Sequence, residues 1–256
     1  MRLNFEVQGG GFPLIIVHGF LGSLDNWRTA SKRLSASYKV YSVDLRNHGE
    51  SPHSELMSYP IMAEDLREFL DEHSLVEAHL LGHSMGGKVV MQFAAEHPSR
   101  VAKLIVVDIA PKAYPPSHPP LLAALRDLYL QAFKSFGQID AALAPAIHEA
   151  SVRQFLLKNL ARDPGLGFRW KIDLDAIIKN YDELTKSIVV KEPVNKPACF
   201  IRGGRSKYIQ DEDLPLIKQM FPRAEVLTIP SAGHWVHADA PDEFLKIVTD
   251  FLQDPK

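Results

Sequence analysis

The fold of this chain is constrained most strongly by the pentapeptide GHSMG at 82–86, which stands between an apolar run and a helical pattern. G-x-S-x-G alone is a weak signal, so its context carries the argument. Residues 77–81 read as a buried strand, and GGKVVMQFAAEH reads as the start of a helix. A strand, a sharp turn and a helix in this order expose the central hydroxyl above a helix N-terminus, and only glycine fits beside such a turn. The pattern predicts that Ser84 is a nucleophile.

Short apolar runs alternate with amphipathic patterns along the first half of the chain and again near its end. The runs that we expect to form strands are 14–17, 39–45, 77–81, 103–108, 198–202 and 225–230. The patterns that we expect to form helices are 26–36, 61–73, 85–97 and 241–252. This alternation is typical of an α/β fold with a mostly parallel central sheet and helices on both faces.

The alternation stops between about Pro111 and Pro197. PKAYPPSHPP is too rich in proline for a helix or a central strand, and three amphipathic patterns follow, over 121–136, 155–160 and 177–184. We therefore expect a helical cap insertion at 112–196. The core domain would then consist of residues 1–111 and 197–256.

A nucleophilic serine needs a base, and the sequence SAGHWVHADAPDEF offers two histidines after the last strand. His234 follows a flexible Ala-Gly step directly after that strand, where a loop reaches the same edge of the sheet as the serine. His237 falls toward the next helix, where a packing role is expected. We predict that His234 is the base.

An oxyanion formed on the substrate needs backbone N–H donors. Met85 opens the helix after the nucleophile, so its N–H points at the developing charge. A second donor comes from another loop at a strand end, and Phe20, after His18-Gly19, is the candidate. His18 and His83 are expected to brace loops.

Five segments, HGFLGS (18–23), DLRNHGES (44–51), GHSMGG (82–87), VVDIAP (106–111) and GHWVHADAP (233–241), resemble the α/β-hydrolase superfamily and follow its order. The chain is most similar to its small bacterial carboxylesterases of the YbfF type. The resemblance implies an α/β-hydrolase fold, with a helical cap over the site.

The acid that orients the base has two candidate positions. The superfamily's usual place reads FIRGGRSKYI, with Ser206 where an aspartate is common, and the alternative place, one strand earlier, holds Asp108. A carboxylate both fixes the imidazole tautomer and stabilises the imidazolium, and its hydrogen bond is about twice as strong as a neutral one. We predict Asp108 as the acid and Ser206 as its neighbour in one network. Asp211 and Asp213 are expected to cap the next helix.

The remaining candidates are few. The resemblance suggests that His48, in the DLRNHGES loop, contacts substrate. Gly9-Gly10-Gly11 leads into a strand without a following Lys-Ser/Thr and is read as a turn. No metal-binding motif stands out, so we expect no metal and no cofactor.

Composition narrows the class of partner. The formal net charge is −2 with scattered Lys and Arg, which disfavours nucleic acid as a partner. No apolar run is long enough to insert in a membrane, and MRLNFEVQGGGF lacks the apolar stretch of a signal peptide. Cys199, the single cysteine, lies in an apolar strand pattern and is expected to be buried, which fits a cytoplasmic location.

Together these features predict a serine hydrolase that cleaves short to medium acyl esters through Ser84, His234 and Asp108. Its partner would be a small acyl ester or thioester. A thioesterase or a carbon–carbon bond hydrolase could use the same residues, and a catalytically silent ligand-binding protein is the rival from another class. The physiological substrate and the oligomeric state stay open.

Overall fold

The computed structural model describes residues 1–163 and 167–254. Within these residues a seven-stranded sheet has the order β1-β3-β2-β4-β5-β8-β9. β1 pairs antiparallel with β3, and the other neighbours pair in parallel. The strands are β1 (Phe5–Gln8), β2 (Pro13–Val17), β3 (Lys39–Val43), β4 (Ala78–His83), β5 (Val101–Val107), β8 (Ala198–Gly203) and β9 (Ala224–Ile229).

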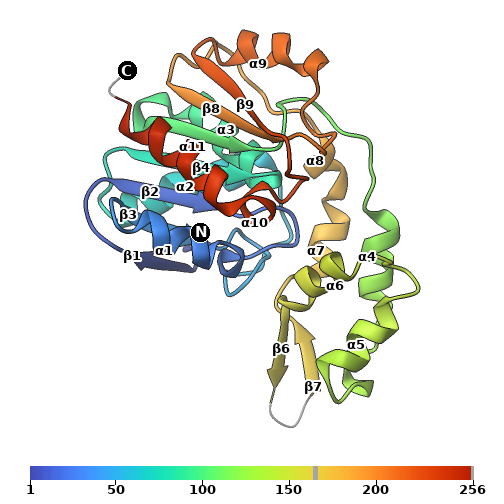
Figure 1. Cartoon of the computed structure of the whole chain (residues 1–256). Coiled ribbons are helices and arrows are strands. Elements are labelled where there is room, and N and C mark those ends of the chain that lie inside the picture. The colour runs from blue at the N-terminus through green and yellow to red at the C-terminus, as the bar shows by residue number, and fades with distance from the viewer. Residues whose placement is uncertain (164–166, 255–256) are drawn as a thin grey trace.

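Two helical layers cover the sheet (Figure 1). Side chains alternate along each strand, so Ile15 and Val17 pack with one layer, and Leu14 and Ile16 with the other. The first layer contains α2 (Tyr59–Glu72), α3 (Met85–Glu96) and α9 (Leu214–Met220). The second contains α1 (Arg28–Leu34), α10 (Val236–Asp239) and α11 (Pro241–Gln253). With apolar contacts on both faces, every residue of β4 is buried.

Between β5 and β8 the chain leaves the sheet and forms a lobe that projects from it (Figure 1). Its elements are α4 (Pro119–Arg126), η3 (Leu130–Ala132), α5 (Phe136–Leu143), α6 (Ala150–Leu157), β6 (Leu160–Asp163), β7 (Gly167–Trp170), α7 (Leu174–Lys179) and α8 (Tyr181–Thr185). We call this lobe the cap.

The cap differs from its sequence prediction in two ways. The helix expected over 121–136 is broken, because α4 ends at Arg126 and Ser135 begins α5 by accepting a hydrogen bond from Gln138 N. Leu160, expected to continue a helix, begins a two-stranded antiparallel hairpin with β7. The cap is therefore not purely helical.

The first strand of the sheet was also not predicted. β1 is a four-residue edge strand that pairs with β3 from Phe5 opposite Val43 to Gln8 opposite Val40. Only one of its sides is paired, and its side chains are half-buried or exposed. It therefore lacks the continuous apolar run that marks the central strands.

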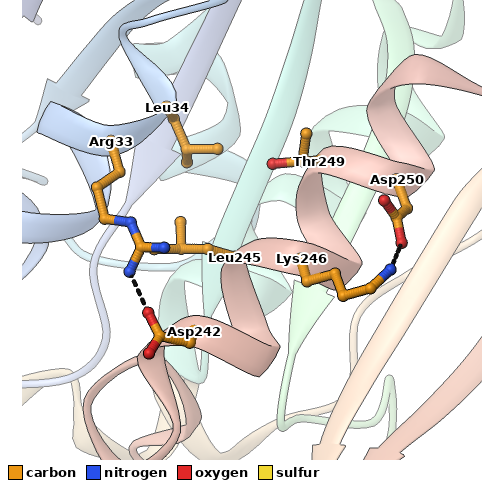
Figure 2. A pocket seen from close by; sticks show the side chains of 7 residues that line it. All are labelled: Arg33, Leu34, Asp242, Leu245, Lys246, Thr249 and Asp250. Atoms are coloured by element: carbon orange, nitrogen blue, oxygen red, sulfur yellow. Dashed lines mark hydrogen bonds and ion pairs between the residues drawn. The ribbon is translucent and has the colours of Figure 1, made fainter.

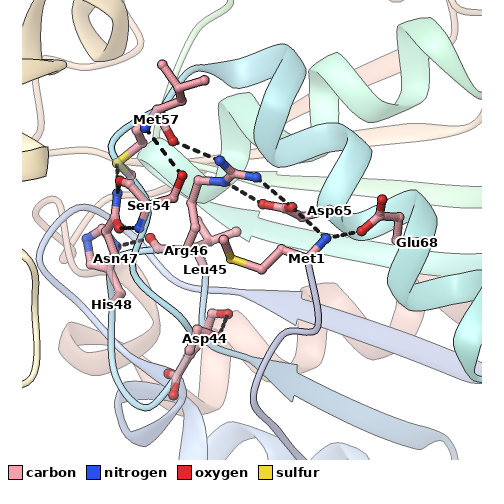
Figure 3. Close-up of polar contacts among 12 residues, drawn as sticks. Met1, Asp44, Leu45, Arg46, Asn47, His48, Ser54, Met57, Asp65 and Glu68 are labelled. Carbon is pink, nitrogen blue, oxygen red and sulfur yellow. Dashed lines mark hydrogen bonds and ion pairs between the residues drawn. The ribbon is translucent and has the colours of Figure 1, made fainter.

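The loop after β3 is fixed by a buried ion pair (Figure 3). Arg46 donates from Nε and Nη2 to the two carboxylate oxygens of Asp65 on α2, at 2.6 and 2.7 Å. Its Nη1 donates to the carbonyl of Leu56 at 2.8 Å. This bidentate pair ties the loop, which carries His48, to the helical layer beneath it.

Candidate active site

Ser84 lies in a sharp turn between β4 and α3. Its backbone has φ 52° and ψ −119°, in the region that non-glycine residues rarely adopt. A Cβ on Gly82 would lie 2.2 Å from the carbonyl oxygen of Gly86, and one on Gly86 would lie 2.3 Å from that of His18. The glycines of GHSMG are therefore required by close backbone contacts, and the turn presents the serine side chain at the C-terminal edge of the sheet.

Three predicted site residues meet at that edge. His234 Nε2 lies 3.1 Å from Ser84 Oγ, and His234 Nδ1 lies 2.8 Å from Asp108 Oδ2. Nδ1 donates to the carboxylate, which leaves the Nε2 lone pair free to accept the serine proton. The residues come from the ends of β4 and β5 and from the loop after β9, so the parallel sheet brings together positions that are 150 residues apart.

Asp108 is fully buried. Its carboxylate accepts hydrogen bonds from neighbouring loops and from β8. Oδ1 accepts from Gly203 N at 3.0 Å, and Oδ2 accepts from the hydroxyl of Ser206 as well as from His234. Tyr208 N in turn donates to Ser206 Oγ at 3.2 Å. The structure thus brings Asp108 into contact with His234, and Ser206 contacts the carboxylate.

Two further side chains hold His234 and were not identified as functional from the sequence. The ring of Tyr208 stacks on the imidazole with centroids 4.0 Å apart. His83 donates from Nε2 to the main-chain carbonyl of His234 at 2.9 Å. Burial lowers the pKa of His83 well below its usual value, so it stays neutral. Tyr208 carries no sequence signal beyond its place near Ser206.

Two backbone N–H groups remain available beside Ser84. Neither Met85 N, at the start of α3, nor Phe20 N donates a hydrogen bond to another residue in the described ranges. His18 fixes the loop that carries Phe20: its Nδ1 donates to the carbonyl of Gly19 at 2.8 Å, and its Nε2 accepts from Leu45 N at 3.0 Å. His18 therefore braces the loop, and both N–H groups are free to donate hydrogen bonds to a negatively charged oxygen.

His48, predicted to contact substrate, is fully buried behind His18, with ring centroids 5.1 Å apart. Its Nδ1 donates to the carbonyl of Arg46 at 2.9 Å, while Nε2 has no partner among the described residues. Burial lowers its pKa to about 3. The structure gives His48 no exposed surface, and a contact with substrate stays a prediction.

The alternative acids and the second histidine lie in other contacts. Asp211 pairs with Arg202 at 2.7 Å, and Asp213 takes part in the capping box before α9. His237 stacks on Trp27, with centroids 4.2 Å apart, as the packing role requires.

The cap contributes a polar group that the sequence did not point out. Tyr181 on α8 accepts hydrogen bonds from Ser117 N at 3.2 Å and His118 N at 3.0 Å. Its single proton is then donated to His118 Nδ1, 2.8 Å away, so the proton of the neutral imidazole is on Nε2. The rings of His118 and Phe20 lie 5.0 Å apart. Burial, and secondly the charge of His234, lower the pKa of His118.

A pocket of about 320 Å³ lies elsewhere, between α1 and α11 (Figure 2). The exposed ion pair between Arg33 and Asp242, at 2.5 Å, joins its two walls. The pocket contains no candidate site residue.

Among the helices of the described ranges, none combines the length and apolar composition that crossing a bilayer requires.

The sequence model of the alpha/beta hydrolase fold family matches residues 13–241, which is most of the chain. The chain belongs to the alpha/beta hydrolase fold family. The α/β-hydrolase fold that the sequence motifs led us to expect is thus confirmed.

Other members of the alpha/beta hydrolase fold family are similar over nearly the whole chain. The sn-1-specific diacylglycerol lipase ABHD11 of Mus musculus is 38% identical over 98% of this chain and 85% of its own length. Esterase YbfF of Escherichia coli is 35% identical over 99% of this chain and 100% of its own. A solved structure titled "Marine microorganism esterase" is 43% identical, with a TM-score of 0.95 and coverage of 98% and 99%.

Proposed function

We propose that this chain is a serine carboxylesterase that hydrolyses short to medium acyl esters by acyl transfer through Ser84. The observation that carries the proposal is the continuous contact from Ser84 Oγ through His234 to the buried carboxylate of Asp108. The names of the similar proteins, which are esterases and lipases, support ester bonds as the target. The rest of the mechanism follows from the groups around these three side chains.

In the first step Ser84 Oγ attacks the ester carbonyl carbon while His234 Nε2 takes its proton. Asp108 holds the Nδ1–H bond and stabilises the positive imidazolium, and Ser206 and Gly203 keep the carboxylate oriented. The carbonyl oxygen becomes an oxyanion that accepts hydrogen bonds from the N–H groups of Met85 and Phe20. Nε2 then protonates the departing alcohol, leaving an acyl group on Ser84.

In the second step water repeats the sequence on the acyl-enzyme. His234 takes a proton from water as its oxygen attacks the acyl carbonyl, and the same imidazole returns the proton to Ser84 Oγ as the acid departs. No cofactor enters this chemistry. The cap, proposed as a unit from 112 to 196 inserted into a core of 1–111 and 197–256, would exclude bulk water and surround the acyl chain.

We expect the neutral His118 of the cap, whose ring lies beside Phe20, to contact the substrate. Its Nε2 proton is fixed by the bond between Nδ1 and Tyr181, and its ring lies against Phe20. We infer that the substrate is a small uncharged acyl ester. A cytoplasmic location is part of the proposal and is supported by the buried, unpaired thiol of Cys199.

Covalent labelling tests the proposal. A fluorophosphonate reacts with a serine only when that serine is activated by a base, so we expect one phosphonyl adduct, located at Ser84 by peptide mass spectrometry. The matched control is Ser54, a partly exposed serine whose hydroxyl accepts a hydrogen bond from Leu56 N and which should stay unlabelled. Absence of an adduct at Ser84 in the folded protein would favour a silent binding protein.

A further inference from the structure

Lys88 lies one helical turn after Ser84 on α3 and is only 1% exposed. A buried ammonium is normally paired with a carboxylate, because taking the charge out of water is costly. In the described parts of the chain, no acidic side chain forms an ion pair with Lys88, and its hydrogen bond goes to a carbonyl. The proposed mechanism leaves this charge without a role.

Lys88 contacts both of the segments that connect the core to the cap. Nζ donates to the carbonyl of Lys186 at 2.5 Å. It also lies 4.9 Å from the ring centroid of Tyr114 and 5.2 Å from that of Tyr59, within the range of cation–π attraction. Tyr114 belongs to the passage into the cap, and Lys186 belongs to the passage out of it.

These two passages, 111–114 and 184–189, form what we call the hinge. They are bonded to each other, since Tyr114 N donates to the carbonyl of Thr185 at 2.8 Å and Ile188 N donates to that of Pro111 at 3.2 Å. Any movement of the cap relative to the sheet must deform these two paired segments.

Neutral groups on the core helices also hold the hinge. On α3, Gln92 lies one turn beyond Lys88, accepts from Val189 N at 2.9 Å and donates to the carbonyl of Val189 at 3.2 Å. From α2, Tyr59 OH donates to the carbonyl of Leu184 at 2.5 Å. Lys88 is therefore the charged member of a row of side chains that attach the hinge to the core.

The hinge continues to the proposed base. Tyr114 OH accepts a hydrogen bond from Ala110 N at 2.9 Å and donates its proton to the carbonyl of Tyr208. The ring of Tyr208 is the one that stacks on His234. A displacement of Tyr114 would thus move the aromatic surface on which His234 rests.

We propose that Lys88 is a positioning residue whose amine, bonded to the carbonyl of Lys186 and lying against the rings of Tyr59 and Tyr114, holds the hinge against α3, and through it the cap and Tyr208 against the active site. Attachment of the hinge does not depend on the proposed function, whereas the effect on His234 rests on it. A buried ammonium carries a desolvation cost that opening of the hinge would relieve, whereas a neutral amine keeps the hydrogen bond to the carbonyl of Lys186 without that cost. The hinge should therefore be held more tightly when Lys88 has lost its proton.

The surroundings make this loss of charge accessible near neutral pH. Burial lowers the pKa of Lys88 to about 7. The phenols that face it stay neutral, because burial raises the pKa of both Tyr59 and Tyr114. The charged groups of neighbouring residues form pairs that do not include Lys88: Lys112 with Asp213, the ammonium of Lys186 with Glu183, and Glu96 with the amide of Gln92. Lys112 Nζ also lies 5.3 Å from the ring centroid of Tyr114, so the two lysines share that ring.

Hydrogen exchange tests the proposal without a substrate. We would measure deuterium uptake in peptides covering 111–114 and 184–189 of the wild type between pH 6 and 8.5, after correction for the intrinsic pH dependence of exchange. Above about pH 7 the closed hinge binds fewer protons than an open one, so we expect protection of the hinge amides to begin to rise near pH 7 and to increase on the order of tenfold by pH 8.5. Lys88→Met should show no such rise.

Gln92→Met is the matched control, because it removes a neutral attachment of the same hinge from the same helix face. It should lower protection at all pH values and keep the rise above pH 7. A wild-type hinge whose protection is constant or falls from pH 6 to 8.5 would overturn the proposal, as would a Lys88→Met variant that keeps the rise. The pH dependence of the wild-type hinge tests the proposal even if Lys88→Met fails to fold.

Kinetics test the second half of the proposal. With an ester substrate, we expect the wild-type KM to fall several-fold as the pH rises above 7 and the KM of Lys88→Met to show no such change, with a smaller effect on kcat. If hinge exchange responds to pH while KM does not, the link to the active site is wrong. If no ester is cleaved by the wild type, the proposed function fails while the hinge result stands.

Discussion

The imidazole of His83 donates a hydrogen bond from Nε2 to the main-chain carbonyl of His234, 2.9 Å away. The residue next to the nucleophile thus fixes the backbone that carries the proposed base. The centroids of the two imidazole rings lie 4.8 Å apart.

This contact predicts the effect of His83→Phe, which keeps a ring and removes the donor. The carbonyl of His234 would lose its partner in a partly buried site, so we expect kcat to fall about tenfold and the free energy of unfolding to fall by about 1 kcal/mol. Steady-state kinetics and urea unfolding measure the two effects. An unchanged kcat in a destabilised variant would show that His83 only packs.

The acid is tested by comparing Asp108→Asn with Ser206→Ala. Asp108→Asn removes the charge that stabilises the imidazolium and the acceptor that fixes its tautomer, so kcat should fall by about 10⁴. Ser206→Ala removes one donor to the carboxylate, and kcat should fall only about tenfold. A larger loss in Ser206→Ala than in Asp108→Asn would reverse the assignment of the acid.

The turn at Ser84 predicts that Gly86→Ala is severely destabilising. The new Cβ would lie 2.3 Å from the carbonyl oxygen of His18 and 2.5 Å from that of Val17, and backbone at the centre of the sheet has little room to move. We expect a loss of about 3 kcal/mol in the free energy of unfolding. Gly10→Ala is the control, since nothing lies within 4 Å of its Cβ position. Equal stabilities in urea would contradict the account of the elbow.

Buried neutral histidines predict how stability depends on pH. Burial lowers the pKa of His18 to about 4 and the pKa of His48 and His237 to about 3, compared with 6.5 in the unfolded chain. Below pH 6.5 the unfolded state therefore binds more protons than the native state, and acid favours unfolding. Their stabilising contribution is complete above pH 6.5 and is lost as the pH falls toward the native values.

Each such histidine contributes a slope of about 1.4 kcal/mol per pH unit in that window. The free energy of unfolding, measured by urea titration from pH 7.5 to 4.5, should thus fall steeply below pH 6.5. His237→Phe, which keeps the stack on Trp27, should make the fall less steep. A stability that is flat from pH 6.5 to 4.5 would contradict the burial of these groups as neutral rings.

The sequence predicted the central sheet well because its strands are continuous apolar runs, and each predicted run overlaps a strand from β2 to β9. Parallel strands end at one edge, so residues placed after strands were expected to meet there, and Ser84, His234 and Asp108 do. The choice of Asp108 over Ser206 needed the additional argument from charge, since position alone favoured the other place.

The remainder depended on contacts that periodicity does not encode. The β6–β7 hairpin is short and has no alternating pattern strong enough to separate Leu160 from a helix. His83, Tyr208 and His118 act on His234 and Phe20 from three separate segments, so no local motif unites them. In the sequence Lys88 looks like an ordinary helix residue. Only the burial of its side chain against the hinge distinguishes it.

Release of p-nitrophenol from acetate, butyrate and octanoate esters, by the wild type and by Ser84→Ala, tests the central claim most directly. Ser84→Ala removes the hydroxyl and leaves the elbow, the oxyanion donors and His234 in place. The account predicts turnover of the short and medium esters by the wild type and a loss of about 10⁴ or more in kcat in a variant of equal stability. Turnover that survives in Ser84→Ala, or a folded wild type that cleaves no ester, would contradict it.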